Sequence, residues 1–196
     1  MSTPFAFASS CRLRLALALT LLAPLAVPAQ TAAPSAPLQT IERLDVARYL
    51  GTWYEIAKYP NRFQRQCATD TQARYRPRED GQLDVINRCR QASGEWSEAV
   101  GRARQIGAAD SPKLEVRFAP AWLSWLPMVW GNYWVIDLDP AYQLVAVSEP
   151  SREYLWVLSR TPTVDAAAYQ ALLARLQAQG FDLSKLERTA QPGGLK

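Results

Sequence analysis

The chain has 196 residues, with 22 lysines and arginines, 18 aspartates and glutamates, and no histidine. The small basic excess is not gathered into a block or stripe, so the composition gives no sign of nucleic-acid binding. The lack of histidine excludes Ser/His and Cys/His nucleophilic catalysis, histidine zinc sites and histidine-ligated haem. We therefore expect neither a metal nor a cofactor.

Residues 1–29 have the pattern of a secretory signal peptide. Arg12 and Arg14 precede an apolar run from Leu15 to Val27, and small residues lead to an expected cleavage site after Ala29. The run is shorter than the roughly 20 residues that span a bilayer, although an uncleaved anchor is the alternative. Cys11 lies before the run, whereas a lipoprotein cysteine would follow it. We expect a periplasmic or secreted protein.

A Pro/Ala-rich linker over 30–40, for which we expect little structure, leads into a domain over 41–192. The domain has short segments of alternating polarity between turn residues, which is typical of an antiparallel sandwich or barrel. The expected strands are 51–59, 68–76, 83–89, 96–106, 113–118, 132–138, 142–148 and 154–159. A short extended piece around 186–189 can pair with a sheet edge.

Helical spacing replaces strand alternation near the end of the chain. It predicts one amphipathic helix over about 164–180, with Thr163 as N-cap and Gly180 as its stop. We therefore predict an all-β fold: an eight-stranded antiparallel up-and-down β-barrel, wide enough for one small ligand, with one C-terminal α-helix packed outside.

The two ends of this barrel can be assigned from strand order. Trp53 begins the first strand, and Arg160 ends the eighth strand at the same end of the barrel. The guanidinium can stack on the indole and close the floor. We interpret both residues as structural, with direct ligand contact as the alternative. The loops after strands one, three, five and seven then surround the open end.

Three motifs carry a family resemblance. They are Gly51-Thr52-Trp53-Tyr54, the turn DLDPAYQ at 137–143, and YLWVLSRTP at 154–162, which includes Arg160. With these motifs in order, the chain resembles the lipocalins, most closely the bacterial lipocalins related to apolipoprotein D. The resemblance implies a carrier of small hydrophobic ligands in which the tryptophan and the arginine pack together. Many bacterial relatives carry a lipoprotein cysteine at the signal cleavage site. This chain lacks one there, so outer-membrane association is left only as an alternative.

Two cysteines remain after signal cleavage, Cys67 and Cys89. An even count in an oxidising compartment favours a disulfide, and both residues fall at the same end of one hairpin. The alternatives are two free thiols, or a nucleophilic Cys67 as in the isomerase branch of the lipocalins.

Alternation along the strands predicts which side chains face the interior, and most of these are apolar or small, as a hydrophobic ligand requires. The predicted ligand-binding residues are Glu55, Ala57, Thr71, Tyr75, Val85, Asn87, Val116, Phe118, Tyr133, Tyr154 and Trp156. Glu55 is the exception in this set, because a buried carboxylate needs a partner. We expect Tyr75, Asn87, a water or the ligand to supply it.

The connection APAWLSWLPMVWGN at 119–132 is unusually apolar for a surface loop, and strand order places it at the open rim. It contains Trp122, Trp125 and Trp130. Three uses are open to it: a lid over the barrel, a patch that enters a membrane interface, or the contact of a homodimer.

These observations predict a carrier in the bacterial envelope that binds and transports a small hydrophobic or amphiphilic ligand. A fatty acid or lysophospholipid is the class that the resemblance implies. We predict no catalytic residues. Two alternatives stay open: an enzyme acting on a lipophilic substrate with Glu55 paired to Tyr75 or Tyr154, and a protein-interaction scaffold that uses the Trp-rich loop.

Overall fold

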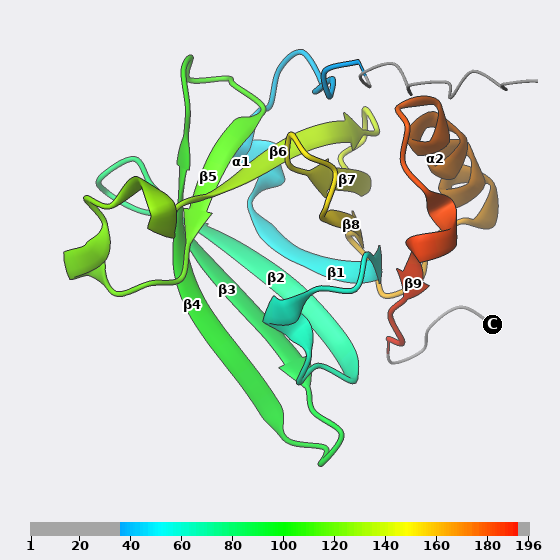
Figure 1. Cartoon of the computed structure of the whole chain (residues 1–196), viewed down its shortest axis with the longest axis horizontal. Helices are drawn as coiled ribbons and strands as arrows, with labels where there is room; N and C mark the ends of the chain where they lie inside the picture. The colour runs from blue at the N-terminus through cyan, green and yellow to red at the C-terminus, as the bar shows by residue number, and fades with distance from the viewer. Residues whose placement is uncertain (1–35, 192–196) are drawn as a thin grey trace, which may run out of the picture. The chain divides into compact units, whose positions relative to one another are not determined.

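A computed structural model of the chain describes residues 36–191 (Figure 1). The strands are β1 Gly51–Lys58, β2 Thr69–Pro77, β3 Leu83–Arg90, β4 Trp96–Gln105, β5 Lys113–Arg117, β6 Gly131–Leu138, β7 Leu144–Ser148, β8 Leu155–Ser159 and β9 Glu187–Arg188. The α-helices are α1 Val46–Tyr49 and α2 Ala166–Ala178. Single 3-10 turns are η1 Arg62–Gln64, η2 Ala121–Leu123, η3 Pro127–Val129 and η4 Leu183–Lys185.

The sheet closes on itself into a barrel. Each strand from β1 to β7 pairs antiparallel with the next, and β8 pairs antiparallel with β1, which closes the barrel. The short strand β9 pairs with the end of β1, at Ala57 and Lys58. The predicted eight-stranded antiparallel barrel is confirmed.

Helix α2 packs against the outside of the barrel (Figure 1). Tyr169, Leu172 and Leu176 are buried in one cluster with residues of β1, β6, β7 and β8, which accounts for their helical spacing in the sequence. Asp165 is the N-cap in place of the expected Thr163, since its side chain accepts the amide hydrogen of Ala168 at 2.8 Å.

The segment before the barrel is partly built into it. Leu38 is buried in the cluster beneath α2, and Arg152 Nη2 donates to the carbonyl of Ala36 at 2.8 Å. The end of the expected linker therefore packs on the barrel instead of lacking structure. The predicted signal peptide and the start of the linker lie outside the described residues.

Arg160 joins the elements that close one end of the barrel. Its guanidinium carbon lies 3.9 Å from the ring centre of the fully buried Trp53. The same group donates to the carbonyls of Arg48 at 2.5 Å, Thr52 at 3.1 Å and Tyr142 at 3.2 Å. One side chain thus connects α1, the start of β1 and the β6–β7 turn, and the predicted stacking of Arg160 on Trp53 is present.

The β6–β7 turn owes its shape to Asp139. Its carboxylate accepts the amide hydrogens of Ala141, Gln143 and Leu144, which lets the chain reverse while Tyr142 adopts a left-handed conformation with φ of 60°. The Tyr142 hydroxyl then accepts the amide hydrogen of Asp45 at 3.0 Å and holds the chain that leads into α1.

We predict that Arg160→Ala lowers the free energy of unfolding by about 2–3 kcal/mol, because it removes a cation–π contact and leaves three carbonyls without their donor. Arg160→Lys should recover only part of the loss, since an ammonium lacks the planar fork that reaches several carbonyls at once. Urea unfolding curves measure both differences. An Arg160→Ala protein as stable as the wild type contradicts this role.

Candidate ligand-binding cavity

The barrel encloses a cavity of about 680 Å³, within the range of ~300–1,000 Å³ typical of small-molecule sites. It opens among the β1–β2, β5–β6 and β7–β8 connections, where Phe63, Phe118 and Tyr154 belong to its lining. Ten of the eleven predicted ligand-binding residues line it: Glu55, Thr71, Tyr75, Val85, Asn87, Val116, Phe118, Tyr133, Tyr154 and Trp156.

Ala57 is the predicted residue that the structure places elsewhere. The pairing of β1 with β8 shifts between Glu55 and Ala57, so one extra residue of β1 opposes consecutive residues of β8. This bulge puts Ile56 and Ala57 together in the cluster beneath α2. Strict alternation predicted an inward Ala57 because a bulge leaves no mark in the polarity pattern.

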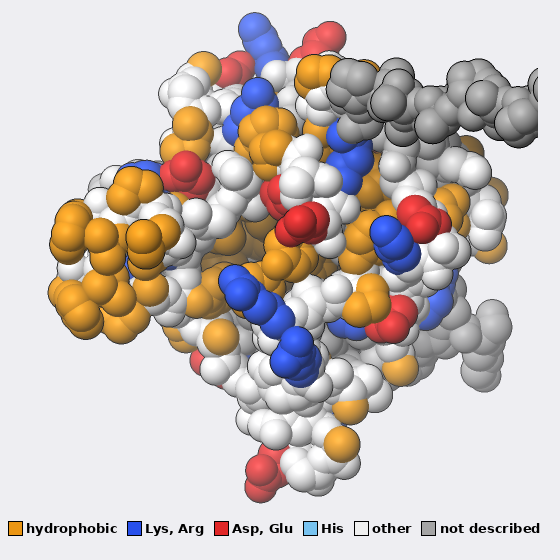
Figure 2. Space-filling model, viewed as in Figure 1, with side chains coloured by type: hydrophobic (Ala, Val, Ile, Leu, Met, Phe, Trp, Pro, Cys, Tyr) orange, Lys and Arg blue, Asp and Glu red, His pale blue; other side chains and the backbone are white. Residues whose placement is uncertain are grey.

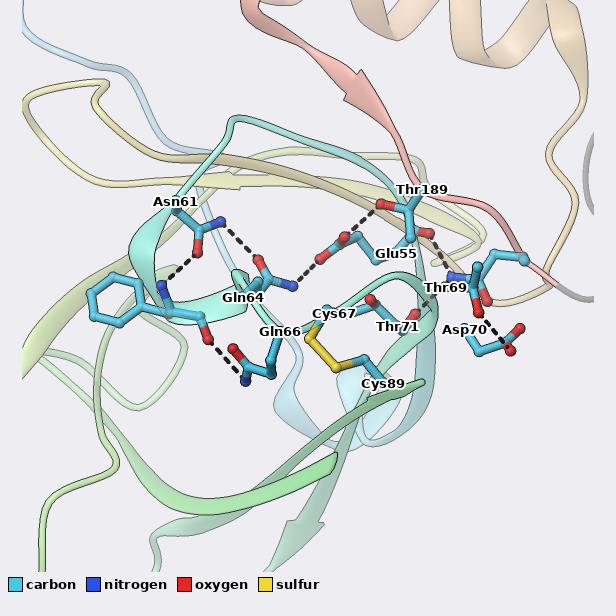
Figure 3. Close-up of a disulfide and its surroundings, with 12 residues drawn as sticks. Glu55, Asn61, Gln64, Gln66, Cys67, Thr69, Asp70, Thr71, Cys89 and Thr189 are labelled. Atoms are coloured by element: carbon cyan, nitrogen blue, oxygen red, sulfur yellow. Dashed lines mark hydrogen bonds between the residues drawn. A yellow bond between two sulfur atoms is a disulfide. The ribbon is translucent and has the colours of Figure 1, made fainter. Parts of the chain in front are cut away.

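Glu55 is buried in the cavity wall and has partners other than those expected. Its carboxylate accepts from Gln64 Nε2 at 2.5 Å and from Thr189 Oγ1 at 2.5 Å (Figure 3). Gln191 Nε2 donates to the main-chain carbonyls of Glu55 and Thr71, both at 2.7 Å. Glu55 thus ties the β1–β2 loop and the C-terminal segment to the first strand, and within residues 36–191 it forms no hydrogen bond with the expected partners Tyr75 and Asn87.

Gln64 extends this network to the cavity mouth. Its Oε1 accepts from Trp156 Nε1 at 2.9 Å and from Asn61 Nδ2 at 2.8 Å. Because Trp156 also lines the cavity and stacks on Tyr154, with ring centres 5.8 Å apart, the wall is coupled to Glu55 through one glutamine. Sequence reasoning missed Gln64, Thr189 and Gln191, since nothing in their local pattern marks long-range partners.

Burial raises the pKa of Glu55 above its ordinary value of 4.5, while the hydrogen bonds from Thr189 and Gln64 and the nearby Lys58 act in the opposite direction. Desolvation is the largest of these effects, because a carboxylate loses its hydration in an apolar wall.

Cys67 and Cys89 form the expected disulfide, with Cα atoms 5.4 Å apart. It joins the β1–β2 loop to β3 close to the Glu55 network (Figure 3). Cys67 is therefore not a free thiol in this structure, and the nucleophile alternative loses its reactive group.

Three tyrosines meet at the closed end of the cavity. The Tyr133 hydroxyl lies 2.7 Å from the hydroxyls of both Tyr49 and Tyr75. Tyr75 and Tyr133 were predicted lining residues, whereas Tyr49 was missed because it comes from α1, outside the strand pattern. Higher in the wall, among the described residues, the buried Asn87 Oδ1 has no hydrogen-bond partner.

The β5–β6 connection projects from the barrel as a hydrophobic lobe, seen at the left of Figure 2. Trp122 is 74% exposed, Trp125 75% and Met128 85%. Trp130 differs from these residues, since its ring lies 4.1 Å from the Arg104 guanidinium and its Nε1 donates to the Ser124 carbonyl at 2.9 Å. In this conformation Trp130 anchors the loop, and the exposed residues do not fill the barrel as a lid would.

No helix within residues 36–191 is long and apolar enough to cross a membrane. The same residues contain no group of three or more cysteine, aspartate and glutamate side chains placed to hold a metal ion.

Comparison with known proteins identifies the family of this barrel. The model of the Lipocalin-like domain matches residues 44–191. The chain belongs to this lipocalin family. Outer membrane lipoprotein Blc of Escherichia coli (strain K12) is 39% identical over 170 residues, which cover 86% of this lipocalin and 92% of Blc.

Two further relatives are eukaryotic. Temperature-induced lipocalin-1 of Arabidopsis thaliana is 39% identical over 156 residues, covering 79% of this chain and 83% of the relative. Apolipoprotein D of Mus musculus is 31% identical over 165 residues, covering 81% and 82%. The predicted membership of the lipocalins is confirmed.

Solved structures support the fold at low sequence identity. Insecticyanin of the tobacco hornworm Manduca sexta superposes with a TM-score of 0.60 at 17% identity, covering 80% of this lipocalin and 89% of that chain. Apocrustacyanin C1 gives a TM-score of 0.59 at 13% identity, covering 76% and 80%.

We predict that Glu55→Gln removes a pH dependence of stability. A carboxyl whose pKa is raised by folding contributes its full stability below the unfolded value, here 4.5, and loses it as the pH rises through the folded value. Glutamine stays neutral, so the wild type should lose stability relative to Glu55→Gln as the pH rises from 4.5 toward neutral. Denaturation curves of both proteins across this range measure the difference. A difference that is constant with pH contradicts the prediction.

Proposed function

We propose that this lipocalin carries a single-chain amphiphile, such as a fatty acid or lysophospholipid, in its barrel. The observation that carries the proposal is the cavity of about 680 Å³, closed at the Trp53 end and open among the loops at the other. A one-ended cup with a mostly apolar wall suits a molecule with one long apolar part.

Affinity in such a cup comes from burial of the chain, at about 25 cal/mol for each Å² of apolar surface removed from water. The apolar lining of the cavity includes the aliphatic side chains of Val85, Val116 and Leu158 and the aromatic ring of Trp156. The head group of the amphiphile lies at the mouth, where it stays in contact with water. The similarity to a lipocalin of Arabidopsis thaliana and to apolipoprotein D supports a hydrophobic cargo.

The bacterial envelope is the proposed location. The signal-like pattern of residues 1–29, the disulfide, and the name outer membrane lipoprotein borne by Blc all support an exported protein. Secretion beyond the envelope is the alternative.

Binding fits the lining better than catalysis. Glu55 accepts two short hydrogen bonds from Gln64 and Thr189, and within residues 36–191 it forms no hydrogen bond with Tyr75 or Tyr154. The acid–base pair that an enzyme acting on a lipophilic substrate needs is therefore not assembled there.

Native mass spectrometry of protein purified from the periplasm without detergent tests the carrier directly. We expect an adduct with the mass of one amphiphile per protein, which lipid extraction identifies. Val85→Phe, which fills the cavity from its wall, should lose the adduct. A wild-type mass that stays unshifted after mixing with fatty acids and lysophospholipids excludes lipid carriage and favours a protein-interaction role.

We further propose that the loop bearing Trp122 and Trp125 contacts the membrane from which the cargo is loaded, since exposed tryptophan is favoured at the membrane–water interface. Trp122→Ser together with Trp125→Ser should slow uptake of a fluorescent fatty acid from anionic vesicles several-fold, because less apolar surface enters the interface. Trp96→Ser, which removes another exposed tryptophan from β4, is the control.

Unchanged uptake by the double variant excludes membrane contact through this loop. Light scattering on the same proteins tests whether the loop forms the contact of a homodimer. Loss of a dimer only in the double variant identifies the loop as a contact between two copies.

A further inference from the structure

The floor of the cavity contains a hydrogen-bond donor without an acceptor. The Tyr49, Tyr75 and Tyr133 hydroxyls form a chain joined by two contacts of 2.7 Å, with Tyr133 in the middle. Each phenol carries one proton, so two contacts use two of three protons. Within residues 36–191 these hydroxyls have no other hydrogen-bond partner. One O–H group is therefore left over in every arrangement of the chain.

The position of the free proton depends on how the chain is polarised. If both outer tyrosines donate to Tyr133, the free proton is on Tyr133; if Tyr49 donates to Tyr133 and Tyr133 to Tyr75, it is on Tyr75. Both residues line the cavity. Only the reverse polarisation leaves it on Tyr49, whose side chain is packed on Trp53 with ring centres 5.0 Å apart. A buried donor left unpaired is costly, so an acceptor in the cavity selects one of the first two arrangements.

The charge near the tyrosine hydroxyls favours an electron-rich ligand atom at the floor of the cavity. Arg160 lies on the far side of the floor, stacked on Trp53, and its guanidinium donates to main-chain carbonyls. No carboxylate among the described residues forms a salt bridge with it, so its positive charge is not neutralised locally.

The tyrosines also remain donors at physiological pH. Burial raises the pKa of Tyr75 to about 12, and it raises the pKa of Tyr49 and of Tyr133 as well.

We propose that Tyr75 and Tyr133 form a polar subsite that donates a hydrogen bond to an oxygen atom at the deep end of the cargo. The inference rests on the proposed carrier function and makes it narrower. The preferred ligand carries an oxygen at the end that enters the barrel first. That oxygen is either a hydroxyl or carbonyl at the far end of an acyl chain that enters tail-first, or, with the orientation reversed from the one proposed above, the carboxylate of an acid that enters carboxyl-first.

Two matched ligands and one double variant test this subsite. Hexadecanoic acid and 16-hydroxyhexadecanoic acid are titrated into the wild type and into Tyr75→Phe/Tyr133→Phe, which lacks both hydroxyls that line the cavity. Tyr154→Phe removes a hydroxyl from the lining near the mouth and is the control. We expect the double variant to bind the 16-hydroxy acid about tenfold more weakly than the wild type does, the equivalent of one hydrogen bond, with little change in Tyr154→Phe.

The pattern across the ligands identifies the source of the oxygen. Weakening of the 16-hydroxy acid alone assigns the subsite to an oxygen on the chain end, and equal weakening of both acids assigns it to a carboxylate that enters first. Affinities within twofold of the wild type for both acids overturn the subsite and leave the carrier function intact. Failure of both acids to bind the wild type overturns the carrier function and the subsite together.

The single variants keep the test decisive if the double variant does not fold. Tyr75→Phe or Tyr133→Phe must weaken the binding of at least one acid, because the ligand oxygen contacts one of these two hydroxyls. Unchanged affinities in both single variants overturn the proposal.

Discussion

The contact of Arg160 with Trp53 and three main-chain carbonyls determines which end of the barrel is closed. It closes one end by joining α1, β1 and the β6–β7 turn, so only the opposite end can admit a ligand. The guanidinium suits this position because its planar fork stacks on an indole and donates in several directions at once. A closed floor also places the tyrosine cluster at a definite depth, with Arg160 behind it.

A second constraint is the buried carboxylate of Glu55. An apolar cup tolerates this charge only where donors compensate for lost hydration, and Gln64 and Thr189 are those donors. These donors come from the β1–β2 loop and from the C-terminal segment. The need to hydrogen-bond one buried carboxylate therefore holds two distant parts of the chain against β1. Because Gln64 also accepts from Trp156, the wall that meets the cargo depends on the same network.

The sequence was sufficient for the barrel, the Trp53–Arg160 pair and ten residues of the lining, because strand alternation and strand order determine them. It failed at Ala57, where the bulge after Glu55 breaks the alternation without a change in composition. The partners of Glu55 were also beyond reach, since Thr189 is 134 residues away and is set by how β9 docks on β1. Tyr49 was missed for a similar reason: its contact with Tyr133 depends on how α1 crosses the closed end.

Fluorescence quenching by a dibrominated stearic acid tests most directly whether the cargo occupies the cavity, because bromine quenches only the tryptophans that it approaches closely. Of the seven tryptophans, Trp130 and Trp156 line the cavity, whereas Trp122 and Trp125 are exposed on the rim loop. The account predicts saturable quenching at one acid per protein that Trp156→Phe reduces and Trp122→Phe/Trp125→Phe preserves. Quenching that disappears with the exposed rim tryptophans and is undiminished in Trp156→Phe would contradict a ligand inside the barrel.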